Sequence, residues 1–179
     1  MGKVIKPLYL LIHYTAGTSA SGAEEWFKNP ASQASSHLII DRDGAIIQMV
    51  PFNRRAWHAG ESKWGELTDI NTHSIGIEIV NAGKLRKRSD GTWLSWANKP
   101  IANEEVTLAT HKNEQRETGW HEFTEAQIQS TLEVGILLAA KYELIDVLGH
   151  DDVAPKRKVD PGSLFPMPSI RSRILGRDA

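Results

Sequence analysis

The chain has 179 residues and a mass of 19.9 kDa, which is the size of one compact domain. Hydrophobic residues make up 40% and charged residues 24%, values typical of a chain that buries a core and is not disordered. The absence of cysteine excludes a disulfide-bonded fold, a thiol nucleophile and a thiolate metal site. The net charge of -1 gives no electrostatic reason to expect nucleic acid as a partner.

No apolar run approaches the roughly 18 residues of a membrane span. The first apolar run, residues 8–12, is short and leads into polar sequence at His13 without a small-residue cleavage pattern. We therefore expect no membrane span and no signal peptide, with synthesis in the cytoplasm.

The first predicted elements are a strand and a short helix. Residues 8–13 (LYLLIH) are apolar at nearly every position, which is typical of a central strand buried on both faces. A loop rich in small and polar residues follows, and Ser21 with Glu24 predicts a capping box that starts a helix. Trp26 and Phe27 are expected to face the core from this helix, which ends at an Asn-Pro step.

Two further strand signals follow. Residues 36–41 and 45–50 flank an Asp-Gly step, which predicts a β-hairpin. Residues 74–80 (SIGIEIV) alternate between isoleucine and other residues. This alternation predicts a strand that carries one carboxylate, Glu78, on the face opposite its isoleucines.

Residues 84–121 are polar, and Trp93, Trp96 and Trp120 lack a regular spacing within them. Glycine and proline interrupt the segment at several points. We interpret it as an insertion with one or two short helical turns.

The C-terminal part of the chain predicts a long helix and a short strand. Thr124 and Gln127 form a second capping box at the start of an amphipathic pattern. Residues 145–148 predict a short buried strand, residues 151–168 a proline-broken loop, and residues 169–175 a terminal helix.

These elements predict an α/β fold of mixed α+β character. We expect one domain over residues 1–179, with a central mixed β-sheet and helices packed on it. The polar insertion at about 84–121 belongs to this domain.

Two histidines are expected at the ends of strands, where loops commonly carry functional sites. His13 ends the first strand and His150 follows the strand at 145–148. Asp160 lies in the next loop, and Lys158 shares its face if that segment is extended. Two imidazoles and one carboxylate with an open fourth position match a catalytic zinc site. Spacing alone leaves this hypothesis open, because no His-x-x-x-His or His-Glu-x-x-His pair is present.

Five blocks of the sequence, taken together, resemble the type 2 N-acetylmuramoyl-L-alanine amidases, zinc enzymes that share a fold with the peptidoglycan recognition proteins. The blocks are LLIHYTAG (10–17), SSHLIIDRDGAIIQMVPFNRRAWHAG (35–60), SIGIEIVNAG (74–83), FTEAQ (123–127) and GHDDVAPKRKVDPG (149–162). The last block is the most specific, because it combines a Gly-His pair with a downstream Lys-x-Asp-Pro-Gly.

The resemblance implies one Zn²⁺ per chain, with His13, His150 and Asp160 as its ligands. It also implies that Glu78 is the acid/base residue and that Lys158 stabilises the oxyanion. Nitrogen and oxygen donors of this kind would also accept cobalt or manganese.

Some members of the family use a cysteine as the third ligand and a tyrosine as the polar catalytic group. In this chain Asp160 takes the first position, and Ser36 stands where the tyrosine aligns. The resemblance therefore places the chain with the members that rely on a strand glutamate.

Further residues near these blocks are candidates for substrate binding. Ser36, His37, Trp57 and His58 are the four candidates, although His37 could equally support the ligands from behind, and Trp57 and His58 could simply pack their loop. We expect no functional role for the remaining histidines, His73, His111 and His121. The basic run at 84–88 is interpreted as a solvated face.

The substrate that the resemblance implies is the amide between the lactyl group of N-acetylmuramic acid and L-alanine. The partner would be peptidoglycan or a soluble anhydro-muropeptide. The chain would act on muropeptides in the cytoplasm, or on the cell wall after release, as a phage endolysin does. Two alternatives remain: a non-catalytic peptidoglycan-binding module on the same fold, and a zinc peptidase that cuts within the stem peptide.

Overall fold

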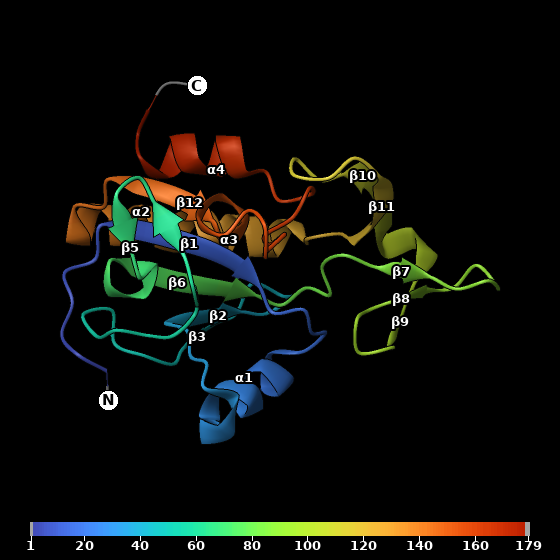
Figure 1. The fold of residues 1–179 in the computed structure, drawn as a ribbon, viewed down its shortest axis with the longest axis horizontal. Coiled ribbons are helices and arrows are strands. Elements are labelled where there is room, and N and C mark those ends of the chain that lie inside the picture. Colours follow the sequence, from blue (N-terminus) through green and yellow to red (C-terminus); the bar gives the residue numbers. More distant parts are fainter. Residues whose placement is uncertain (1, 178–179) are drawn as a thin grey trace.

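The computed structural model describes residues 2–177 and contains a five-stranded mixed sheet with the strand order β12-β1-β6-β2-β3 (Figure 1). Its strands are β1 (Tyr9–Tyr14), β2 (Leu38–Ile40), β3 (Ile46–Gln48), β6 (Ser74–Ile79) and β12 (Asp146–Gly149). Strands β12, β1, β6 and β2 are parallel, and β3 at the edge is antiparallel to β2. The predicted mixed α/β architecture is confirmed, and the carboxyl ends of four strands meet at one edge of the sheet.

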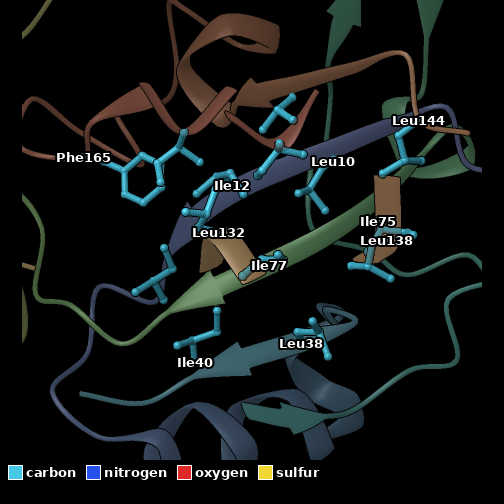
Figure 2. Packing of buried hydrophobic residues seen from close by; sticks show 14 residues of the cluster. Leu10, Ile12, Leu38, Ile40, Ile75, Ile77, Leu132, Leu138, Leu144 and Phe165 are labelled. Atoms are coloured by element: carbon cyan, nitrogen blue, oxygen red, sulfur yellow. The ribbon is translucent and has the colours of Figure 1, made fainter. Parts of the chain in front are cut away.

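Helices α2 (Glu125–Tyr142) and α4 (Met167–Ile174) cover one face of this sheet. Figure 2 shows the isoleucine and leucine side chains of β1, β2 and β6 directed toward α2. Most of these side chains are completely buried, and each stabilises the fold by about 1.5–3 kcal/mol. The predicted capping box is present: the Thr124 hydroxyl accepts the Gln127 N–H, and the Gln127 side chain accepts the Thr124 N–H.

Helix α1 (Ala20–Lys28) covers part of the opposite face. Its N-cap is Ser19, whose hydroxyl accepts the Gly22 N–H, so the predicted capping box at Ser21 is wrong by two positions. Ala20, Ala23 and Phe27 form the stripe that packs on the sheet. Trp26 is rotated by about 100° from Phe27 around the helix axis. It is therefore 57% exposed, and the prediction that it faces the core is wrong.

The shorter elements lie in the connections. They are η1 (Pro30–Ser32), β4 (Lys63–Trp64), β5 (Leu67–Thr68), η2 (Ile70–Thr72) and α3 (His150–Val153). The β2–β3 hairpin turns where the Asp-Gly step predicts it, with Gly44 at a φ of 88° and its N–H donated to Asp41. Within residues 2–177, no helix is both long and apolar enough to cross a membrane.

The segment 84–121 consists mainly of short strands and contains one short helical turn, η3, within the one or two that the sequence predicts. It contains β7 (Arg86–Lys87), β8 (Trp93–Leu94), β9 (Pro100–Ile101), η3 (Asn103–Glu105), β10 (Val106–Thr110) and β11 (Glu117–His121). Strands β7 to β9 form one small sheet and β10 with β11 another, with a small apolar core around Leu85 and Ile101. In Figure 1 this segment projects beyond the ends of β1 and β6 to which their arrows point.

Candidate metal centre and active site

The candidate functional side chains lie on the sheet face opposite α2 and α4, at the carboxyl ends of the parallel strands. His13 on β1 and Glu78 on β6 are paired positions of neighbouring strands. Because successive side chains of a strand alternate between faces, both point away from the isoleucine core. His150 follows the end of β12, on the other side of β1. The strand register therefore brings together residues that are far apart in the sequence.

The three predicted ligands meet at one point. His13 Nδ1, His150 Nδ1 and Asp160 Oδ2 lie 2.9 Å from one another in all three pairs. The three side chains are buried, with exposed fractions of 7% or less. Within residues 2–177, they are the cluster of histidine and carboxylate groups that could hold a metal ion.

Hydrogen bonds at the outer nitrogens define the protonation of both imidazoles. His150 Nε2 donates to the Ala59 carbonyl oxygen at 2.9 Å, which leaves Nδ1 with a free lone pair. The Ser74 hydroxyl donates to a carbonyl and therefore accepts from His58 Nε2. His58 Nδ1 must then accept from His13 Nε2, at 3.0 Å. His13 Nδ1 is thus also unprotonated, which is the form that binds a metal.

The donor set fits a divalent cation. Burial and the neighbouring His150 imidazole lower the pKa of His13 to about 4, so that its imidazole is neutral at pH 7. Two neutral nitrogens and one carboxylate oxygen then face one another with no proton between them, an arrangement that a cation stabilises. A tetrahedral Zn²⁺ with bonds of about 2.0–2.1 Å separates its ligands by about 3.3 Å. The observed triangle needs to open by only a few tenths of an ångström.

Glu78 and Lys158 line the same pocket as the three ligands, and this pocket has a volume of about 360 Å³. Burial raises the pKa of Glu78 well above its usual value, and the nearby Asp160 carboxylate adds to this, whereas the Lys158 cation opposes it. Among residues 2–177, no hydrogen bond or ion pair involves the Glu78 carboxylate, which leaves it available to a water molecule in the pocket. Lys158 is half-buried and lines the pocket together with Asp160.

The four substrate-binding candidates separate into two pairs. Trp57 and His58 line the pocket, although His58 is buried and bound to His13. Ser36 and His37 are completely buried and do not line it. The Ser36 hydroxyl donates to the Gly76 carbonyl, and His37 is bonded to backbone groups at both ring nitrogens, Gly76 N and Arg54 O. These contacts favour a structural role for Ser36 and His37, behind strand β6.

Several residues of the pocket carry no signal in the sequence. Trp26 and Phe27 of α1 line one wall. Arg157 donates to the carbonyl oxygens of Ala59 and Glu61, at 2.8 and 2.6 Å. It thereby joins the Asp160 loop to the turn that binds His150. In the sequence, Arg157 is indistinguishable from a solvated basic residue.

The 84–121 segment also contacts the part of the chain that carries the candidate ligands His150 and Asp160. His111 Nε2 and Lys112 Nζ each contact the Asp151 carboxylate at 2.9 Å. The Asp151 N–H in turn donates to the carbonyl oxygen of Asp160. His111 therefore connects the segment to the loop that carries Asp151.

Gly76 is required for the position of His58. A Cβ at Gly76 would lie 2.6 Å from the Cγ and Nδ1 atoms of the His58 ring, and this ring is buried. We expect Gly76→Ala to displace His58 from His13 and to destabilise the fold by about 1–3 kcal/mol, the usual effect of overpacking. Thermal unfolding should show a decrease in Tm of about 2–10 °C.

Gly17→Ala is the matched control for this prediction. A Cβ at Gly17 would meet one atom, the Thr15 hydroxyl oxygen, at an ordinary distance of 3.6 Å. We expect its Tm to stay within about 2 °C of the wild type, the normal range for a substitution that creates no clash. Equal Tm values for both variants would contradict the steric role of Gly76.

Comparison with known proteins relates this geometry to a family. The family model described as N-acetylmuramoyl-L-alanine amidase matches residues 3–163. The chain is 34% identical over 161 residues to the 1,6-anhydro-N-acetylmuramyl-L-alanine amidase AmpD of Salmonella typhimurium, covering 88% of this chain and 67% of AmpD. It is 38% identical over 82 residues to the amidase XlyA of Bacillus subtilis, covering 44% of this chain and 26% of XlyA.

A solved structure agrees with the sequence comparison. Escherichia coli AmiD, in complex with the substrate anhydro-N-acetylmuramic acid-L-Ala-D-γ-Glu-L-Lys, superposes with a TM-score of 0.71 at 30% identity. The alignment covers 100% of this chain and 60% of that chain, so the chain spans about 60% of the length of this relative. The family match over most of the sequence and the shared fold together show that the chain belongs to the N-acetylmuramoyl-L-alanine amidase family.

Proposed function

We propose that the chain is a zinc-dependent amidase that hydrolyses the bond between the lactyl group of N-acetylmuramic acid and L-alanine. The observation that carries this proposal is the meeting of His13, His150 and Asp160 in the pocket that also contains Glu78 and Lys158. AmpD and AmiD are named as amidases of the bond between a muramyl group and L-alanine, which supports our assignment of the cleaved bond.

His13, His150 and Asp160 would hold the zinc ion. When bound, Zn²⁺ supplies a Lewis acid and lowers the pKa of a coordinated water from about 16 toward 7. Two imidazoles and a carboxylate match the ligands of catalytic zinc sites. Because the ligands are buried beside an open pocket, substrate can reach the ion from one side.

Glu78 transfers the proton. Its carboxylate accepts a proton from the attacking water as the water oxygen bonds to the lactyl carbonyl carbon. It then donates this proton to the alanine nitrogen as the C–N bond breaks. The products are a lactyl carboxylate and a free α-amine. The elevated pKa of Glu78 suits both steps, because the group must bind and release a proton near neutral pH.

Lys158 stabilises the negative charge that develops on the carbonyl oxygen. Its ammonium group is held at the pocket by a loop that the Lys158 N–H closes through a hydrogen bond to Ala154. A donor directed at such an oxyanion commonly lowers the barrier by about 3–4 kcal/mol. Lys158 also offsets the charges of Glu78 and Asp160.

The complete set of groups argues against a non-catalytic binding module on this fold. A binding module needs neither a proton-transfer group nor a cation beside a ligand cluster, and this pocket contains both in Glu78 and Lys158. A peptidase that cuts within the stem peptide would use the same machinery. The product therefore distinguishes the two enzymes.

Mass spectrometry of the products tests the proposal. We expect purified protein with added Zn²⁺ to release stem peptides with a free N-terminal L-alanine from peptidoglycan or from soluble anhydro-muramoyl peptides. A new terminus within the peptide would support the peptidase, and an intact substrate in both assays would contradict catalysis. Glu78→Gln protein is the matched control for contaminating hydrolases.

A further inference from the structure

A second cavity, of about 380 Å³, opens beside the catalytic pocket. It lies between the loop that follows β1, helix α1 and the β8–β9 turn of the 84–121 segment. Thr15, Ala16, Trp26 and Phe27 line both this cavity and the catalytic pocket. The two spaces therefore adjoin each other, and the volume of the second lies within the range of small-molecule sites, about 300–1,000 Å³.

The lining of this cavity combines exposed indole rings with hydroxyl groups. Trp26 and Trp96 are 57% and 75% exposed, although tryptophan is normally among the most buried side chains. Thr18 and Ser19 contribute hydroxyl oxygens, and none of the residues lining the cavity is a carboxylate. The single charge in the lining is Lys99. A neutral ligand with an apolar face and a polar rim suits this surface, and a pyranose ring has both.

The Trp96 indole is held in place before any ligand binds. Its Nε1 donates to the Ala16 carbonyl oxygen at 2.8 Å. The turn that carries it is closed by a hydrogen bond from the Ser95 N–H to the Lys99 carbonyl oxygen, at 2.9 Å. Ala16 has a φ of 58°, a strained value for a residue other than glycine. Fixed aromatic rings bind with a small loss of conformational entropy, as a stacking platform requires.

A third space beside the catalytic pocket has a different chemistry. A larger space, of about 690 Å³, shares Phe27, Ala34 and Trp57 with the catalytic pocket. Its polar lining includes Lys28 and Asn29, which suit the amide and carboxylate groups of a peptide. A substrate cut between a sugar and a peptide has two chemically different halves. The two spaces that adjoin the catalytic pocket differ in the same way, one lined by indole rings and hydroxyl groups and the other by Lys28 and Asn29.

We propose that the cavity between Trp26 and Trp96 is a subsite for an N-acetylhexosamine ring on the glycan side of the scissile bond. The inference rests on the proposed function for the identity of the substrate, whereas binding of a sugar ring in the cavity does not require catalysis. Trp96 makes the 84–121 segment a determinant of substrate specificity. The indole faces stack on the C–H groups of the ring, and the hydroxyls and Lys99 bind its polar edge.

A binding experiment that needs no turnover tests the subsite. We expect titration with β-1,4-linked N-acetylglucosamine disaccharide to shift the indole N–H NMR signals of Trp26 and Trp96. Trp96→Ala should weaken this binding about tenfold, whereas Trp96→Phe, which keeps an aromatic face, should weaken it less than about threefold. Leu108→Ala, an exposed apolar position of the same segment, is the matched control and should bind as the wild type does.

Two binding results would overturn the subsite. One is unchanged disaccharide affinity in Trp96→Ala. The other is a shift of both indole signals by the free stem peptide L-Ala-γ-D-Glu-L-Lys without a shift by the disaccharide, which would assign the cavity to the peptide.

Kinetics then separate failure of the subsite from failure of the proposed function. Three substrates share one stem peptide and carry a lactoyl group alone, a muramoyl group or a disaccharide. We expect the addition of sugar to raise kcat/KM at least about tenfold in the wild type, and Trp96→Ala to lose most of this gain. Cleavage without any gain from sugar would overturn the subsite alone. No cleavage of any of the three would contradict the amidase, and the NMR titration would still decide the subsite.

Discussion

Replacement of His150 by alanine is expected to remove bound zinc and hydrolysis together. The substitution deletes one of three ligands and leaves His13 Nδ1 and Asp160 Oδ2 as a two-ligand site. Two ligands cannot exclude water and other chelators from the ion. The Lewis acid contributes several kcal/mol to the barrier, so activity should fall by about 1,000-fold or more.

Metal analysis of purified protein provides the measurement, together with muropeptide hydrolysis before and after chelation. The wild type should contain about one zinc per chain, lose its activity to a chelator and regain it with Zn²⁺. His73→Ala is the matched control, because this histidine lies at the opposite end of β6 and should leave metal and activity unchanged. Full activity after exhaustive chelation, or unchanged zinc content in His150→Ala, would contradict the ligand assignment.

The central sheet and the ligand cluster could be predicted because their signals are local. The apolar run of β1 and the alternation of β6 appear within a few residues, and the alternation identifies which face each side chain of β6 takes. Parallel strands align their carboxyl ends, so histidines at the ends of two strands become neighbours without any knowledge of the loops. The assignment of Asp160 as the third ligand depended on the resemblance to the amidase family, because its distance from His13 in the sequence does not imply contact.

The rest depends on contacts that no local pattern encodes. The strands of the 84–121 segment are two to five residues long, and such short hairpins lack a period that distinguishes them from turns. Trp26 looked like a core residue because of its type, but only the packing of Ala23 and Phe27 shows which side of α1 faces the sheet. No sequence pattern near His37 or His58 indicates its partner. Folding brings His37 to the backbone amide of Gly76 and His58 to His13.

Glu78→Gln is expected to separate catalysis from metal binding. Glutamine keeps the shape of the side chain but cannot accept a proton from water, so kcat should fall by about 10²–10⁴. The zinc ligands are untouched, so the zinc content should remain at the wild-type level. Normal turnover in this variant would remove Glu78 from the mechanism, whereas loss of zinc would assign it to the metal site.

The same variant should also stabilise the metal-free protein at neutral pH, because Glu78 is a buried carboxylic acid whose pKa lies above its usual value. At pH 4 and below, the group is protonated in both the folded and the unfolded states and does not affect stability. As the pH rises above the unfolded pKa, the unfolded chain releases this proton more readily, and the free energy of unfolding decreases.

Glutamine removes that loss, so the Tm of the chelated variant should exceed that of the chelated wild type at pH 7 by about 2–4 °C for each kcal/mol recovered. The difference should vanish near pH 4. Equal Tm values at pH 7 would mean that the Glu78 carboxylate is as well solvated in the fold as in water, and the same result would remove the basis for its elevated pKa in catalysis.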